Sequence, residues 1–167
     1  MRDEPGRPPA GVGRTAFLFF LRFLAVSIPL YALYAAAGIH YMKLVATVSK
    51  PLFSLFDLEL AMGRALAVTE DISLNPIVFI SLVAATAGVA IPRRIWAGII
   101  GFAVLTLANS TTLFLVFLSA SRGSERLWAG TEFLNLTINF FLPLLLWIVL
   151  LPVVSLAAGL RRPQDNV

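Results

Sequence analysis

The sequence has no cysteine and a single histidine, His40, among its 167 residues. The absence of cysteine excludes disulfides, thiolate metal sites and cysteine nucleophiles. A single histidine also excludes a metal or haem site that needs several histidines. We therefore expect no metal ion, haem or other cofactor.

Charged residues are also scarce, at 13% of the chain, against about 25% in soluble domains. Hydrophobic residues make up 59% and the mean hydropathy is +0.87, and a soluble fold of this length has too small a core to hide that excess. The formal net charge of +4 is dispersed at the ends of apolar runs and is not gathered on one face, which argues against nucleic-acid binding. The composition indicates an integral membrane protein surrounded by lipid.

Two uncharged runs, residues 72–92 and 95–121, organise the chain on either side of Pro92-Arg93-Arg94. Each run is long enough to cross a hydrocarbon core about 30 Å thick as a helix rising about 1.5 Å per residue. Two adjacent arginines are costly in lipid, so Arg93 and Arg94 are predicted to form an aqueous elbow on the cytoplasmic side.

A third apolar run, residues 15–38, precedes them and contains Arg22, which is near enough to its end for the side chain to reach the interface. An alternative is a cleaved signal peptide, with residues 23–34 as its apolar region and Ala35-Ala36-Ala37 as its cleavage site. Counted from Thr15, the run exceeds the usual length of about 7–15 residues, which favours a retained span.

Residues 39–72 are predicted to form an extracytoplasmic insert. Apolar residues at helical spacing around Leu52 and Phe56 predict an amphipathic helix lying in the membrane interface, with Pro51 in its first turn. Weak alternation over residues 64–70 is compatible with a short strand or hairpin arm. Asn75 is then expected to cap the next helix, with Pro76 at its first position.

A polar loop over residues 120–132, with Trp128 as an interfacial anchor, leads to a last uncharged run at 133–160. We therefore predict an all-α integral membrane protein with one domain, residues 15–160. Its predicted parts are a disordered cytoplasmic tail at 1–14, four transmembrane helices at about 15–38, 74–92, 95–119 and 134–158, the insert at 39–72, and a cytoplasmic tail at 161–167.

The distribution of basic residues predicts the topology. One side of a four-span arrangement receives Arg2, Arg7, Arg14, Arg93, Arg94, Arg161 and Arg162, together with Arg22. The other side receives Lys43, Lys50, Arg64, Arg122 and Arg126, offset by Asp57, Glu59, Glu70, Asp71, Glu125 and Glu132. The positive-inside rule therefore predicts that both termini are cytoplasmic.

Polar residues inside the last two spans are the candidate functional residues. The polar run Asn109-Ser110-Thr111-Thr112 interrupts the third span, and we single out Asn109 and Thr112 in it. Asn135 and Asn139 share a face near the start of the fourth span. In lipid such side chains hydrogen-bond across helices, so we expect Asn109 to meet Asn135 or Asn139 as interhelical contacts or as an interaction site.

Other residues have weaker signals. His40 lies at the outer end of the first span and lacks a nucleophile motif beside it, which favours an interfacial role. Glu132 is either a solvated carboxylate at the mouth of the fourth span or a proton-transfer group. Gly88, Gly98 and Gly101 would allow neighbouring helices to approach closely.

The layout resembles the exosortase/archaeosortase family of membrane transpeptidase-like proteins, whose proposed catalytic set is a Cys, an Arg and a His. Asn109 matches the family's Asn, but Thr112 stands at the position of the Arg. Residues 73–76 (SLNP) contain no Cys, and residues 132–135 (EFLN) contain no His. Over residues 39–152 the layout is more similar to the small exosortase H-associated membrane proteins.

The resemblance implies a bacterial inner-membrane location and a non-catalytic accessory or assembly subunit of a larger membrane complex. A larger membrane protein or a second copy is then the expected partner. Two alternatives stay open. One is a degenerate exosortase-like enzyme in which Ser73 or Thr112 replaces the missing groups, although a neutral Thr cannot supply the fixed charge of an Arg. The other is a small transporter or channel subunit, with Asn109 as its deepest polar group.

Overall fold

The computed structural model describes residues 10–72 and 74–151. In that part of the chain the secondary structure is entirely helical, in five helices: α1 (Ala10–Leu55), α2 (Met62–Ile72), α3 (Asn75–Ala85), α4 (Ile91–Arg122) and α5 (Glu125–Leu150). Three of them, α1, α4 and α5, are long and apolar enough to cross a membrane. The prediction of a helical membrane protein is therefore confirmed.

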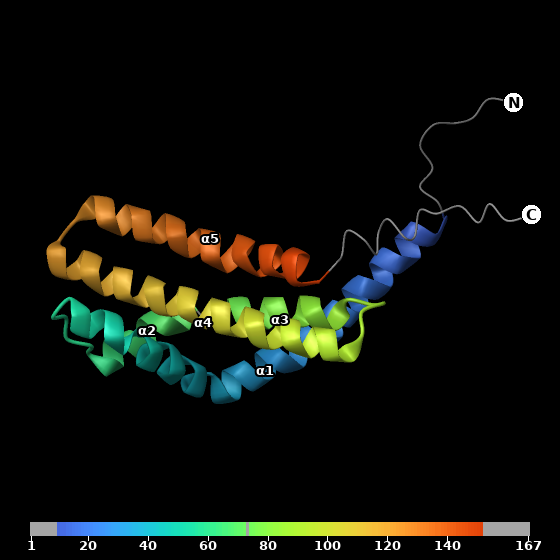
Figure 1. The fold of residues 1–167 in the computed structure, drawn as a ribbon, viewed down its shortest axis with the longest axis horizontal. Helices are drawn as coiled ribbons and strands as arrows, with labels where there is room; N and C mark the ends of the chain where they lie inside the picture. The colour runs from blue at the N-terminus through green and yellow to red at the C-terminus, as the bar shows by residue number, and fades with distance from the viewer. Residues whose placement is uncertain (1–9, 73, 152–167) are drawn as a thin grey trace, which may run out of the picture.

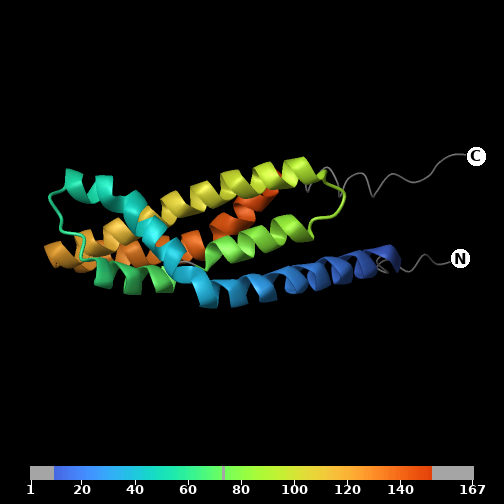
Figure 2. The same ribbon diagram turned by 90° about the horizontal axis from the view of Figure 1, so that it is seen from below.

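The helices form an elongated bundle in which α4 and α5 are antiparallel neighbours (Figures 1 and 2). The start of α1, the turn between α3 and α4, and the end of α5 lie toward one end of the bundle (Figure 1). The turn between α1 and α2 and the turn between α4 and α5 lie toward the other. Between these ends, α2 and α3 follow one another in the same direction, and together they return the chain along the bundle (Figure 2).

Helix α1 is longer than the predicted first span. It contains 46 residues and continues without a break through the first part of the predicted insert. Ala10–Arg14 are helical too, so the predicted disordered tail is wrong for these residues, while residues 1–9 lie outside the described chain. Pro51 lies inside α1 and not in the first turn of a separate helix. Hydropathy predicts where a helix leaves lipid, but helical hydrogen bonds continue into water wherever one face still packs.

Residues 64–70, considered as a strand or hairpin arm, lie instead in helix α2. The next helix, α3, has 11 residues, fewer than the ~20 needed to span the core alone. Its N-cap is Leu74 and not Asn75, which is the first helical residue. The turn after α3 occupies residues 86–90, where Gly88 has a φ of 78°. Arg93 and Arg94 therefore lie in the first turn of α4 and not in the elbow itself.

The predicted loop at 120–132 is reduced to Gly123 and Ser124. Gly123 ends α4 in the left-handed conformation (φ 57°), and its N–H group donates to the Ser119 carbonyl. Such a C-cap favours glycine, because a Cβ is strained there. Ser124 caps α5 by accepting a hydrogen bond from the Leu127 N–H at 3.3 Å. The predicted end of the last span, near residue 158, lies outside the described residues.

Two hydrophobic clusters hold the bundle together. The first joins α1, α2 and the end of α4, where the ring of Phe53 lies edge-on to Phe114 and Phe117, with centroids 5.7 and 5.2 Å away. The second joins α3, α5 and the first half of α4, and it includes Phe79, Val83, Val89, Ala97, Leu105 and Leu151. In the second cluster α3 and α4 approach so closely that the Phe79 ring occupies the place where a side chain at Gly101 would be.

Of the three glycines predicted to favour close packing, Gly101 therefore makes such a contact. Gly98 has open space around the position of a Cβ. Gly88 lies in the turn between α3 and α4.

Candidate functional site

A layer of polar side chains lies between the two hydrophobic clusters, around the middle of α4. Asn75 from α3 and Asn109 from α4 face each other, and each is only 1% exposed. Each amide nitrogen donates to the other's carbonyl oxygen, with both Nδ2–Oδ1 distances at 3.0 Å. The two amides therefore form a closed, reciprocal pair, although 34 residues separate them in the sequence.

Helix α1 joins this layer through Tyr41 and a backbone carbonyl. The second hydrogen of the Asn109 amide donates to the Tyr41 hydroxyl at 2.9 Å. The Ser110 hydroxyl lies 3.1 Å from the Val45 carbonyl oxygen and 2.8 Å from the Thr106 carbonyl oxygen, so it bridges α4 to α1. We call Tyr41, Asn75, Asn109 and Ser110 the polar layer, because they join α1, α3 and α4 at one level.

The local sequence explains why these side chains meet. Pro76 has no backbone N–H and a fixed φ, so it is favourable in the first turn of α3 and sets the start of the helix. Asn75 is thereby placed at the end of α3, with its side chain turned into the bundle. On α4, Leu105, Asn109 and Leu113 are spaced by four residues and are all buried. Asn109 is therefore an amide within an otherwise apolar inner face.

Chemically, the polar layer can hold helices together and fix their positions. Both hydrogens on the Asn109 amide nitrogen and its carbonyl oxygen are already hydrogen-bonded inside the bundle. An amide cannot carry a proton at physiological pH and is not a nucleophile. Within the described residues, no group of three His, Asp or Glu side chains could hold a metal ion.

Asn135 and Asn139 do not join this layer. Asn139 donates to the Asn135 carbonyl oxygen at 2.7 Å, one turn away on the same helix. The predicted contact between Asn109 and one of these residues is therefore wrong, because Asn75 and Tyr41 occupy the Asn109 amide. Thr112 is buried and its hydroxyl donates to the Ala108 carbonyl oxygen at 3.1 Å, within α4 itself.

The elbow end of the bundle has its own polar contacts. Arg93 is exposed, whereas Arg94 is partly buried and its Nε donates to the Val89 carbonyl oxygen at 2.9 Å. Nearby, the indole N–H of Trp147 donates to the Thr86 hydroxyl at 2.7 Å. The Trp147 ring also contacts Phe19, with centroids 5.7 Å apart. Through Trp147, these contacts connect the turn after α3 to α5, and α5 to the first half of α1.

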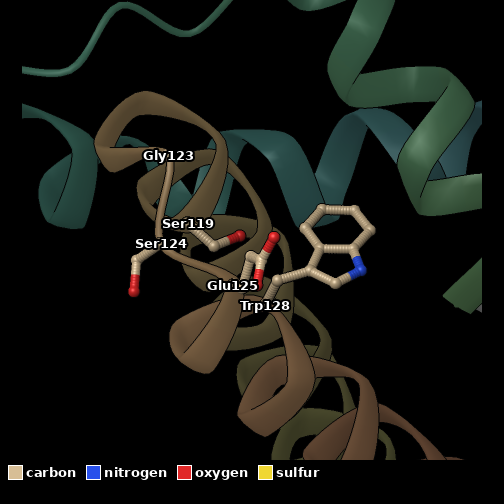
Figure 3. Close-up of a pocket in the computed structure, with 5 residues that line it drawn as sticks. All are labelled: Ser119, Gly123, Ser124, Glu125 and Trp128. Carbon is tan, nitrogen blue, oxygen red and sulfur yellow. The ribbon is translucent and has the colours of Figure 1, made fainter.

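One open pocket of about 250 Å³ lies at the turn between α4 and α5 (Figure 3). It is lined by Ser119, Gly123, Ser124, Glu125 and Trp128. The Ser119 hydroxyl donates to the Val116 carbonyl oxygen at 2.8 Å, and Ser124 caps α5. The Ser119 and Ser124 hydroxyl groups, which line the pocket, thus already form hydrogen bonds to the backbone at the helix ends. His40 and Glu132 are exposed and lie outside the polar layer.

Sequence reasoning missed two members of the polar layer. Asn75 precedes a proline, a pattern typical of a helix cap, so its role as a partner of Asn109 was not predicted. Tyr41 follows His40 at the predicted membrane interface, where tyrosine is common. The one usable signal was the rule that an amide such as Asn109 inside an apolar run needs a hydrogen-bond partner on another helix.

Comparisons of this chain with protein-family models, with curated proteins and with solved structures find no match.

Proposed function

We propose that this protein is a non-catalytic subunit of a larger membrane complex, in which it acts as a helical scaffold. The observation that carries the proposal is the polar layer, in which the Asn109 amide is bonded inside the bundle through both of its N–H groups and its carbonyl oxygen. Reactive sites usually contain groups with perturbed protonation or unpaired donors aimed at a substrate. Both N–H groups of Asn109 are bonded inside the bundle, and Asn75 donates to and accepts from Asn109, so the two amides serve to join three helices.

The residues that a degenerate exosortase-like enzyme would need give it little support. Thr112 is buried, its hydroxyl is bonded to its own helix, and it carries no charge that could stabilise an oxyanion. Ser73, the other candidate, lies outside the described residues. The exosortase-type sorting system implied by the resemblance remains our candidate for the complex itself.

We also propose that the chain crosses the membrane four times, with both termini in the cytoplasm. The supporting observation is that Arg14 and Arg93 come from α1 and α4 segments at the same end of the bundle (Figure 1). Because α3 is too short to cross alone, α2 and α3 together make the return crossing. Because the chain has no cysteine, Arg93→Cys and Ser121→Cys can each be labelled alone. A membrane-impermeant maleimide should label Ser121→Cys in intact cells and Arg93→Cys only after lysis, and the opposite pattern refutes the topology.

The function is tested by purifying the tagged protein from its native membrane in a mild detergent, with mass spectrometry of the proteins that accompany it. We expect a larger membrane protein in fixed stoichiometry, and its identity tests whether the system is of the exosortase type. Recovery of this chain alone, as a stable monomer or homo-oligomer, refutes the subunit proposal. That outcome would favour an independent transporter or enzyme.

A further inference from the structure

Helix α5 carries a polar stripe along one side of its first four turns. Trp128, Glu132, Asn135 and Asn139 are spaced by four, three and four residues, so they share one face of the helix. We call these four residues the α5 stripe. Trp128 is 44% exposed, Glu132 is exposed, and Asn135 and Asn139 are partly exposed. The stripe lies beside the side of α5 that packs on α4, where Thr131 and Ile138 are buried.

The amides of the stripe keep unused hydrogen-bonding capacity. The single bond from Asn139 to Asn135 uses one N–H group and one carbonyl oxygen. Within the described part of the chain, the Asn135 amide nitrogen and the Asn139 carbonyl oxygen have no other partner. Both residues lie in the middle of a helix that is long and apolar enough to span the membrane. Lipid tails offer neither donors nor acceptors to such groups.

The stripe is uncovered because α3 is short. Farther along the same side of α5, Leu142 and Leu146 pack against the second hydrophobic cluster, to which α3 contributes Phe79 and Val83. Helix α3 begins at Asn75, which is bonded to Asn109. Gly123 and Ser124 form the turn between α4 and α5. Asn109 lies 14 residues before Gly123 on α4, and Asn139 lies 15 residues after Ser124 on α5. The start of α3 is therefore nearly level with Asn139.

Beyond that level the chain continues as α2, which packs against α1 and α4. The length left uncovered, from Trp128 to Asn139, is about 16 Å at about 1.5 Å per residue, or roughly half of the hydrocarbon core. One more helix could lie there, against the side of α5 that carries the stripe.

We propose that the α5 stripe is the docking site for a transmembrane helix of the partner protein, an inference that rests on the proposed function. The chemistry of the stripe specifies the facing side of that helix. An amide or hydroxyl at the level of Asn135 and Asn139 completes their hydrogen bonds, and a Lys or Arg one turn nearer the outer surface pairs with Glu132. Trp128 packs against the apolar residues next to that cation.

A second copy of this chain fits the stripe less well. Symmetric pairing of two α5 helices would satisfy the amides, because an amide is both donor and acceptor. It would also place Glu132 opposite the Glu132 of the other copy, and like charges that face each other repel. The charge of the stripe therefore favours a different protein over a second copy.

The test uses the full-length protein and its co-purifying partner. In Asn135→Leu/Asn139→Leu we expect the recovery of partner at limiting concentration to fall about tenfold, and about threefold for either single variant, as expected for the loss of one or two interhelical hydrogen bonds. Thr137→Val is the matched control. It removes a polar group from the other side of α5, where the hydroxyl is already bonded to the Phe133 carbonyl oxygen at 2.9 Å, and it should bind as the wild type does.

Two further measurements separate docking from folding. Glu132 is exposed, so Glu132→Lys and Glu132→Gln should both fold; the Lys variant should lose more partner than the Gln variant. A photo-crosslinking amino acid at position 132 should capture the partner, whereas the same group at position 133, about 100° around the helix, where Phe133 is 74% exposed, should not.

The outcomes distinguish this inference from the proposed function. If the wild type recovers its partner and the stripe variants recover it equally well, docking at the stripe is refuted while the subunit function stands. If position 132 crosslinks to a second copy of this chain, a homodimer replaces the partner helix. If the wild type recovers no partner, both proposals fail together.

Discussion

Removing the Asn109 amide of the Asn75–Asn109 pair should destabilise the bundle by about 3–5 kcal/mol. Asn109→Ala deletes three hydrogen bonds, two to Asn75 at 3.0 Å and one to Tyr41 at 2.9 Å. At about 0.6 kcal/mol for each interhelical bond in a membrane protein, these bonds contribute about 1.8 kcal/mol. The stranded Asn75 amide, only 1% exposed, adds a desolvation penalty of about 1–3 kcal/mol.

A double-mutant cycle isolates the pair itself. Asn75→Ala/Asn109→Ala leaves neither amide stranded, so the double variant should be less destabilised than the sum of the two single variants. We expect a coupling free energy of at least about 2 kcal/mol, from two reciprocal bonds at about 0.6 kcal/mol each and the relieved desolvation of about 1–3 kcal/mol. The measurement is equilibrium unfolding in mixed micelles with an increasing fraction of a denaturing detergent, followed by tryptophan fluorescence.

Thr111→Val is the control for this cycle, because Thr111 is exposed and its hydroxyl bonds only to the Leu107 carbonyl oxygen of its own helix, at 2.9 Å. Its unfolding free energy should change by less than about 0.5 kcal/mol. Additivity of the two asparagine variants within about 0.3–0.5 kcal/mol would mean that the amides do not interact, and the role assigned to the polar layer would then be wrong.

Three further predictions concern packing and can be measured with the same unfolding assay. Gly101→Ala should lower the unfolding free energy by about 1–3 kcal/mol, because the added methyl group overpacks against Phe79. Gly98→Ala adds a methyl group in open space and should be neutral or stabilising. Equal effects of the two substitutions would refute the close approach of α3 and α4. Trp147→Phe should lower the unfolding free energy by about 1 kcal/mol through loss of the 2.7 Å bond to Thr86. Adding Thr86→Val to that variant should lower it little further, and full additivity of the two substitutions would argue against the bond. Phe53→Ala should cost about 3–5 kcal/mol and make the turn at residues 56–61 more susceptible to protease, since Phe53 is 2% exposed at the centre of the first cluster; unchanged cleavage would show that α2 is held by other contacts.

The sequence predicted the long helices well where lipid decides the structure. Residues 95–119 and 134–158 are uncharged, and a backbone in lipid must satisfy its own hydrogen bonds. Helices were therefore predicted there, and α4 and α5 contain residues 95–119 and 134–150. Prediction was poorer outside the apolar runs. The first span was predicted to end near residue 38, yet α1 continues to Leu55. Lys43 and Lys50 are exposed on this extension, while Val45 and Phe53 are buried in the first cluster.

The short α3 shows a second limit of hydropathy. Residues 72–92 read as one uncharged span, but the helix ends at Ala85 and Gly88 takes a positive φ in the turn that follows. Glycine in an apolar run is compatible with a helix or with a turn, and only the packing of α3 against α4 decides between them. The hydrogen-bond partner of Asn109 could not be predicted from the sequence for a similar reason. Periodicity shows which residues share a face of one helix, but not which faces of two helices meet.

The polar layer has a consequence that apolar packing alone could not produce. Hydrophobic clusters tolerate small axial shifts, because one methyl group replaces another at little cost. A reciprocal amide pair does not, since a shift of one residue, about 1.5 Å along the axis, breaks both bonds at once. Asn75 and Asn109 therefore fix the depth of α3, whose other contacts in the second cluster are apolar packing contacts. That depth in turn decides how much of α5 stays uncovered, so one buried hydrogen-bonded pair sets both the internal register of the bundle and the surface it offers to another helix.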